Sequence, residues 1–207
     1  MTEVVVLAGE RGSGKTTLIN TLVAASVFDE PPTVFECETG TRTIDWDLVS
    51  DGRVALWPVK PNQDTEGEKS HEKNLQVSLT TIMSTVAPRT IIIEAWSAAS
   101  AKDIVRIVHA VAESYPMEIS AAITLVDGHD LAEIPSTSSG LSHLVSDASF
   151  IALVKCDDLS DFMLFRIRGV IHAFSNAPVV TYGKRSDVAR LLRLAEVAWT
   201  LSQFDAE

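Results

Sequence analysis

The sequence has few cysteines and few positive charges, and each shortage excludes a class of protein. Its 207 residues include two cysteines, Cys37 and Cys156, with no Cys-x-x-Cys spacing. They can build neither a disulfide framework nor a cysteine-rich zinc site. Lysine and arginine together number 17 against 28 acidic residues, which gives a formal net charge of −11. Because binding to a phosphate backbone needs clustered positive charge, we expect no nucleic-acid partner.

Long apolar segments are also missing from the sequence. No apolar run approaches the length of a membrane span, so we expect no membrane partner. A strand is expected from residue 3 onward, which leaves no room for a signal peptide before it. Hydrophobic residues still make up 46% of the chain, an ordinary share for a globular protein. We therefore expect a folded cytoplasmic protein with one domain over residues 1–207.

One short motif has a specific chemical meaning. Residues 9–16, Gly-Glu-Arg-Gly-Ser-Gly-Lys-Thr, match the phosphate-loop pattern G-x-x-x-x-G-K-[ST] at every fixed position. A strand is predicted before the motif at residues 3–8, and a helix after it up to about Ala25. In such a loop, backbone N–H groups and a helix N-terminus converge on phosphate oxygens. The residues predicted to bind a nucleotide here are Gly9, Arg11, Gly12, Ser13, Gly14, Lys15, Thr16 and Thr17.

Two side chains of the motif have distinct expected roles. Lys15 is expected to reach the β- and γ-phosphates of the nucleotide, and the Thr16 hydroxyl to ligate Mg²⁺. The motif therefore predicts a P-loop nucleotide-binding protein whose cofactors are GTP or ATP and Mg²⁺.

Predicted strands and helices alternate along the rest of the chain. Further strands are predicted at residues 33–37, 53–57, 90–94, 119–127, 150–154 and 178–181. Helices are predicted at about residues 75–86, 100–111 and 161–174 and from about residue 186 onward, with polar loops at 60–73 and 133–143. This order predicts a doubly wound α/β fold with a mainly parallel sheet and helices on both faces.

A glycine and four charged residues stand where predicted strands end. They are Gly9, Glu38, Glu94, Asp127 and Lys155. In parallel sheets of this kind, ligands bind beyond the carboxyl ends of the strands. We therefore expect these five residues to share one rim of the sheet.

A second motif follows the predicted strand at residues 150–154. Lys155-Cys156-Asp157 resembles the Asn-Lys-x-Asp motif of guanine-nucleotide proteins, with Val154 at the asparagine position. In that motif the carboxylate accepts hydrogen bonds from N1–H and the exocyclic amine of guanine, and the lysine stem packs along the base. Adenine has no such pair of donors, so the carboxylate selects against it. Lys155 and Asp157 are therefore predicted to bind guanine, with a solvated Lys-x-Asp turn as the alternative.

Together these segments resemble the CobW/HypB/UreG family of metallochaperone GTPases. The resemblance rests on residues 9–20, on Glu38-Thr39-Gly40 with Ile44-Asp45, on residues 91–97 and on Leu125-Val126-Asp127. It implies a Mg²⁺-dependent switch protein that binds and hydrolyses GTP, with a link to the assembly of a metal centre or cofactor.

The resemblance also implies roles for two carboxylates. Glu38 would lie in the first switch region near Mg²⁺ or a transported metal, and Glu94 would end the second-switch strand close to Mg²⁺ or its water. The implied catalytic residues are Lys15, Glu94 and Glu38, and the implied metal ligands are Thr16, Glu38 and Glu94.

The sequence departs from the family pattern at several positions. The family has a Cys-x-Cys-Cys metal motif at the position where this sequence has Trp57-Pro58-Val59-Lys60-Pro61. The Cys-Pro-His motif of the urease-type branch is absent from the sequence as well. Ser97 replaces a glycine whose N–H would meet the γ-phosphate. We also expect no counterpart of the additional C-terminal domain of CobW proteins.

Two further residues have open interpretations. Cys37, flanked by Glu36 and Glu38, is either part of a zinc site completed by His71 or a buried cysteine at a strand end. Trp96 is either a nucleotide-sensitive switch residue, an anchor for a partner, or a core residue.

Other functions remain open beside a GTP-hydrolysing switch. One is an interaction module that is gated by GTP or ATP and barely hydrolyses it, and another is a small-molecule P-loop kinase. The kinase would need an arginine-rich lid, whereas residues 60–73 contain lysines and no arginine. A ParA/MinD-type ATPase is disfavoured because Glu10 stands where its extra loop lysine belongs. Expected partners are the nucleotide, an unknown client protein and a second copy of the chain, across which Arg11 or Arg42 could act.

Overall fold

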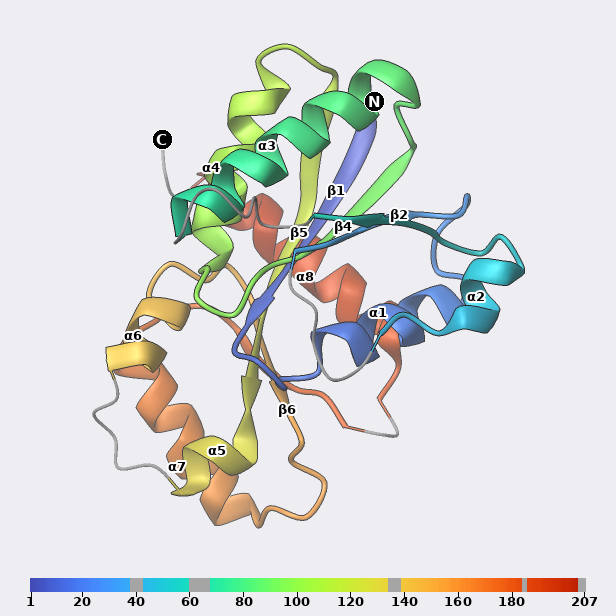
Figure 1. The fold of residues 1–207 in the computed structure, drawn as a ribbon. Helices are drawn as coiled ribbons and strands as arrows, with labels where there is room; N and C mark the ends of the chain where they lie inside the picture. Colours follow the sequence, from blue (N-terminus) through green and yellow to red (C-terminus); the bar gives the residue numbers. More distant parts are fainter. Residues whose placement is uncertain (38–42, 60–67, 134–138, 184–185, 205–207) are drawn as a thin grey trace.

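The structure, a computed structural model, describes residues 1–37, 43–59, 68–133, 139–183 and 186–204. Its centre is a seven-stranded sheet with the strand order β3-β2-β4-β1-β5-β6-β7 (Figure 1). The strands are β1 (Thr2–Gly9), β2 (Thr33–Glu36), β3 (Ala55–Pro58), β4 (Thr90–Glu94), β5 (Met117–Asp127), β6 (Ile151–Val154) and β7 (Val179–Thr181). All pairings between neighbours are parallel, which confirms the predicted fold class.

Helices cover both faces of this sheet (Figure 1). The helices are α1 (Lys15–Ala24), α2 (Trp46–Ser50), α3 (Glu68–Thr85), α4 (Ala101–Ala112), α5 (Gly128–Glu133), α6 (Ser139–Val145), α7 (Asp161–His172) and α8 (Val188–Phe204). Successive strand residues point to opposite faces, so in β1 Val4 and Val6 pack towards α3 and α4, whereas Val5 and Leu7 pack towards α1 and α8. The continuous apolar runs of the sequence therefore correspond to strands buried on both sides.

Helix α4 forms as the sequence predicts. The Ser100 side chain accepts a hydrogen bond from the backbone N–H of Asp103, and the Asp103 carboxylate accepts one from the backbone N–H of Ser100. This capping box satisfies N–H groups that have no partner inside the helix. Apolar residues at helical spacing form its buried face, namely Ile104, Ile107, Val108 and Val111.

The predicted polar loop at residues 60–73 is wrong for its last part. Helix α3 already begins at Glu68, so its first turns are polar and show no apolar period. These turns are tied to the neighbouring elements by other contacts: His71 stacks on Trp96 with ring centroids 5.3 Å apart, and Glu72 pairs with Arg106 at 2.7 Å. The helix ends at Thr85, one residue before the predicted end, and Val86 is 64% exposed.

The predicted loop at residues 133–143 is also partly wrong. Residues 134–138 lie outside the described part, but α6 occupies the rest of the range from Ser139 onward. Leu141, Leu144 and Val145 fall on one side of this helix and are buried in the core that α7 shares. Their spacing of three and four residues is helical, although the surrounding serines and glycine obscure it in the sequence.

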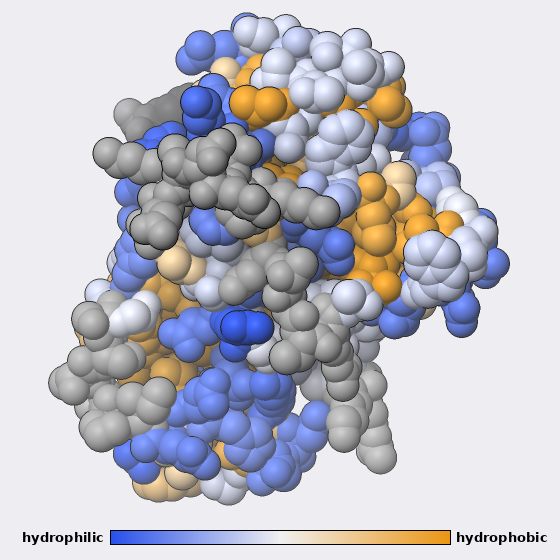
Figure 2. All heavy atoms as spheres, in the orientation of Figure 1, coloured by the Kyte–Doolittle hydropathy of each residue, from blue (hydrophilic) through white to orange (hydrophobic). Residues whose placement is uncertain are grey.

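The outer surface is mixed in character. Figure 2 shows hydrophilic residues over the region of α5 and the end of β6, and a hydrophobic area beside α2. Within the described ranges, none of the helices combines the length and apolar character needed to span a lipid bilayer.

Candidate functional site

The carboxyl ends of the central strands bring four predicted residues to one rim. In the parallel registers, Gly9 is opposite Leu125 of β5, and Glu94 is opposite Leu7, two residues before the phosphate loop. Asp127 ends β5, and Lys155 follows β6 directly. Gly9, Glu94, Asp127 and Lys155 therefore lie on the rim where the sequence predicts them. The fifth predicted residue, Glu38, lies outside the described residues, as does Arg42.

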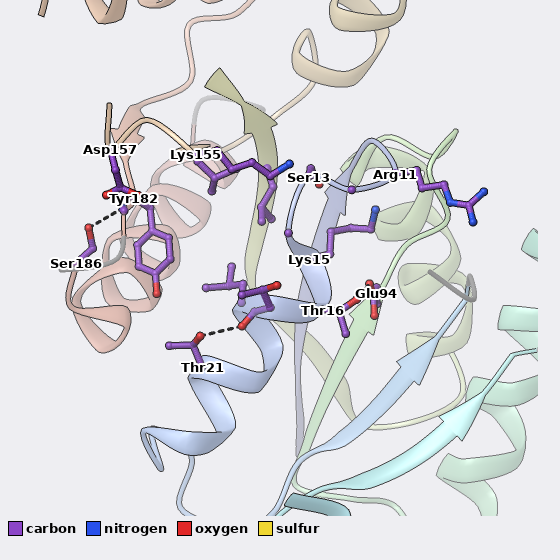
Figure 3. A pocket seen from close by; sticks show the side chains of 17 residues that line it. Arg11, Ser13, Lys15, Thr16, Thr21, Glu94, Lys155, Asp157, Tyr182 and Ser186 are labelled. Atoms are coloured by element: carbon purple, nitrogen blue, oxygen red, sulfur yellow. Dashed lines mark hydrogen bonds between the residues drawn. The ribbon is translucent and has the colours of Figure 1, made fainter. Parts of the chain in front are cut away.

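A pocket of about 640 Å³ opens on this rim, over the N-terminus of α1 (Figure 3). Most predicted nucleotide-binding residues line it: Arg11, Gly12, Ser13, Gly14, Lys15, Thr16 and Thr17 from the loop and α1, with Glu94, Lys155 and Asp157. Gly9, the first residue of the loop and the last of β1, does not line the pocket. Further residues that were not predicted also line the pocket, namely Leu18, Thr21, Leu125, Val154, Tyr182, Gly183 and Ser186.

The phosphate loop depends on glycine at two places. At Gly9 a side-chain Cβ would lie 2.6 Å from the Leu125 carbonyl oxygen and 2.7 Å from Ser13 Oγ, so the loop can leave β1 only without a side chain there. Gly14, with φ of 97°, is the N-cap of α1 and makes no side-chain cap. The first N–H groups of α1 therefore lack a side-chain cap at the pocket, where the helix dipole favours an anion.

Lys15 is held across the loop by two hydrogen bonds. Its Nζ donates to the carbonyl oxygens of Gly9, at 2.7 Å, and Glu10, at 3.1 Å. Ser13 is 2% exposed, and its Oγ has no hydrogen-bond partner within the described part of the chain. A buried ammonium, an orphaned hydroxyl and an uncapped helix N-terminus together suit the negatively charged oxygens of a phosphate chain.

Two side-chain oxygens, from Thr16 and Glu94, lie together beside the loop. Thr16 Oγ1 donates to Glu94 Oε1 at 2.6 Å, and Glu94 is 6% exposed. Mg²⁺ prefers oxygen ligands and is usually bound by one or two protein side chains together with phosphates and waters. The pair therefore fits a Mg²⁺ ion that bridges the protein and a nucleotide. Burial raises the pKa of the neighbouring Cys37 thiol above its ordinary value, and the charge of Glu94 adds to this.

The opposite end of the pocket is formed by two turns. Lys155 and Asp157 come from the turn after β6, and Tyr182, Gly183 and Ser186 from the segment between β7 and α8 (Figure 3). A Cβ on Gly183 would lie 2.4 Å from Asp157 Oδ1, so the carboxylate packs directly on the second turn. Burial raises the pKa of the Tyr182 hydroxyl above its ordinary value. The only sequence signal for this second turn is that it also follows a predicted strand.

Cys37 and Trp96, for which the sequence left several roles open, are both buried in the structure. Cys37 is 1% exposed at the end of β2, and Trp96 is buried in the core against α3 and α4, where it stacks on His71. Burial raises the pKa of Glu36. Among the residues that the structure describes, no three His, Cys, Asp or Glu side chains are grouped to hold a metal ion.

The sheet is parallel, a glycine-rich loop joins its first strand to the first helix, and acids stand at the ends of neighbouring strands. These features define a P-loop nucleotide-binding fold. The sequence pattern of the family described as "CobW/HypB/UreG, nucleotide-binding domain" matches residues 3–180. The chain therefore belongs to the CobW/HypB/UreG family. No curated protein matches its sequence.

Several solved structures share the fold. HypB, a hydrogenase maturation factor from Archaeoglobus fulgidus, has a TM-score of 0.63 at 10% identity, over 93% of this chain and 88% of HypB. HypB from Helicobacter pylori, in complex with nickel, has a TM-score of 0.61 at 13% identity, over 99% of this chain and 88% of that one. The Zn(II)-bound YjiA GTPase from E. coli has a TM-score of 0.58 at 20% identity, over 90% of this chain but 58% of YjiA.

Proposed function

We propose that this chain is a cytoplasmic, single-domain switch protein that binds GTP with Mg²⁺ and hydrolyses it to GDP. The observation that carries the proposal is the composition of one pocket. The phosphate loop and the Thr16–Glu94 pair lie at one end of it, and Lys155 and Asp157 lie at the other. A nucleoside triphosphate has the matching order of parts, with a charged phosphate chain at one end and a base at the other.

At the phosphate end, each residue has a defined task. The N–H groups of the loop and of α1 bind phosphate oxygens, and Lys15 exchanges its two carbonyl partners for the β- and γ-phosphates. Thr16 and Glu94 hold Mg²⁺, directly or through water. When bound, Mg²⁺ supplies positive charge against the charge that develops on the phosphate oxygens.

At the base end, Asp157 accepts from the two donors of guanine, and the Lys155 stem covers the face of the base. Val154 stands where guanine-nucleotide proteins have asparagine, so this preference rests on the carboxylate. An adenine base in the same position would leave the carboxylate without its donors, which costs affinity.

Intrinsic hydrolysis in this proposal is slow and accelerates on dimerisation or on binding of a client protein. Arg11 is the single arginine among the described residues that line the pocket, and it is exposed. A cation supplied by a partner is worth on the order of 10³–10⁵ in rate for phosphoryl transfer. Because two similar structures are a hydrogenase maturation factor and a nickel-bound HypB, the proposed client is a protein that receives a metal centre or cofactor.

The test compares GTP and ATP binding and phosphate release, with Mg²⁺ and with EDTA, in the wild type and Lys15→Ala. We expect the wild type to bind GTP more tightly than ATP and to release phosphate only with Mg²⁺. Lys15→Ala should lose nucleotide binding while its circular dichroism spectrum and nucleotide-free melting curve stay close to those of the wild type. Unchanged GTP affinity in the variant would contradict the phosphate-loop assignment, and equal affinities for GTP and ATP would contradict the guanine assignment.

The second candidate is an interaction module that binds the nucleotide and barely hydrolyses it. It is favoured by the small number of charged donors at the phosphate end, where Lys15 and Arg11 are the described cationic residues. Single-turnover phosphate release measured across a range of protein concentrations separates the two. A rate that stays negligible at high concentration would favour the module.

A further inference from the structure

Lys155 has an ion-pair partner on the neighbouring strand. Its Nζ donates to Oδ2 of Asp127, the last residue of β5, across the register in which Asp127 is opposite Val154. The two residues are 28 positions apart in the chain. Lys155 itself has φ of 53°, in the left-handed region that a lysine seldom adopts. The turn after β6 is thus held in an unusual backbone conformation while its lysine is tied to β5.

Asp127 is fixed from the other side as well. It is 8% exposed, and its second oxygen, Oδ1, accepts from the backbone N–H groups of His129, at 3.0 Å, and Asp130, at 3.4 Å. Gly128 lies so close to the next turn that a Cβ on it would be 2.4 Å from Cys156 Sγ. The carboxylate of Asp127 therefore has one orientation, set by the first turn of α5, and it gives Lys155 a fixed acceptor.

Lys155 lies among several acidic side chains, so a fixed acceptor decides which of them its ammonium pairs with. Burial is the main cause that raises the pKa of the Cys156 thiol, and the nearby carboxylates of Asp127, Asp157 and Asp158 add to it, so three acids surround this turn. The surface around α5 and the end of β6 is correspondingly hydrophilic (Figure 2). An ammonium without a fixed partner could pair with any of these acids, including the one proposed to read the base. Val154 brings no amide to brace the turn.

The geometry points to Asp127 as a positioning residue for the nucleobase. By pairing with Lys155, it holds the lysine stem as one wall of the base site and keeps the ammonium directed at β5 rather than at Asp157. In Figure 3, Lys155 lies between Asp157 and the phosphate loop, where its stem can cover a bound base. This inference rests on the proposed function, because it assigns a role within the same pocket.

The test measures dissociation constants by calorimetry for three probes with Mg²⁺: GTP, ATP and inorganic tripolyphosphate, which has no base. We expect Asp127→Asn to weaken GTP binding about tenfold, as for the loss of a charged hydrogen bond, and to leave tripolyphosphate binding unchanged. Lys155→Met keeps the stem and removes the ammonium, so it should weaken GTP binding to a similar degree. The double variant should be no worse than either single variant, because both remove the same interaction.

Asp130→Asn is the matched control. It removes the same charge in the first turn of α5, just after Asp127, from an exposed residue whose side chain makes no hydrogen bond or ion pair with Lys155 in the described part of the chain. It should therefore leave all three constants unchanged. A purely structural role of Asp127 would weaken GTP and tripolyphosphate together or lower only the melting temperature, and either result overturns the inference. The inference is also overturned if Asp127→Asn and Asp130→Asn have the same dissociation constant for GTP. If the wild type binds GTP no better than ATP or tripolyphosphate, the proposed function fails first, which is a different and recognisable result.

Discussion

Replacing Gly9 by alanine tests the phosphate loop without assuming any ligand. The new Cβ would lie 2.6 Å from the Leu125 carbonyl oxygen and 2.7 Å from Ser13 Oγ, below the 3.0 Å that real Cβ contacts essentially never cross. The nearer atom belongs to the backbone of β5, so it cannot swing away as a flexible side chain does. The residue also has φ of 145°, which L side chains rarely adopt.

The expected cost of Gly9→Ala is the sum of two effects. Backbone strain of this kind costs about 1–3 kcal/mol, and forcing an extra methyl group into a filled space costs about 1–3 kcal/mol. Together they predict a loss of about 2–6 kcal/mol. At roughly 2–4 °C per kcal/mol for a chain of this size, the melting temperature should fall by about 4–24 °C.

Thermal unfolding followed by circular dichroism, without nucleotide, measures this loss. Gly12→Ala is the matched control, because Gly12 has φ of 82° but nothing within 4 Å of its Cβ position, so it should lose only about 1–2 kcal/mol. Gly169→Ala, within α7 and equally free of neighbours, should gain up to about 1 kcal/mol from helix propensity. A melting temperature for Gly9→Ala equal to that of Gly12→Ala would refute the close packing of the loop on β5.

Three further variants probe the two ends of the pocket and the turn after β6. Mg²⁺ should increase the GTP affinity of Glu94→Gln by a factor about 10-fold or more smaller than in the wild type, because the side chain paired with Thr16 has lost its charge. An equal increase in the variant and the wild type would contradict the assigned role of Glu94. Asp157→Asn should weaken GTP binding and improve binding of xanthosine triphosphate, whose 2-oxo group can accept a hydrogen bond from the new amide. Competition binding with both nucleotides measures this change. An unchanged order of affinities would argue against recognition of the base by Asp157. Burial, helped by nearby carboxylates, raises the pKa of Cys156 from 9.0 to about 11, so its thiol contributes stability below pH 9 that is lost as the pH rises towards 11. Urea unfolding at several pH values should therefore give a steeper loss for the wild type than for Cys156→Ala over this window, and parallel curves would contradict it.

Much of the fold was predictable because it depends on local patterns. A strand buried on both faces is a continuous apolar run, and residues 90–94 were predicted with the bounds that β4 has. The errors occur where the local pattern is weak. The first turns of α3 carry no apolar residues, and they are held by the His71 stack and the Glu72 pair, which are contacts with distant residues.

The sequence by itself determined the phosphate loop, the parallel class of the sheet and the rim on which Gly9, Glu94 and Lys155 meet, because motif spacing and strand-end position are local properties. The tertiary structure alone decided the strand order, and with it which rim residues touch. β5 lies beside β6, so Asp127 reaches Lys155, and β7 lies beside β6, so Gly183 packs on Asp157. Such contacts depend on how whole elements pack against one another, and no local pattern encodes that.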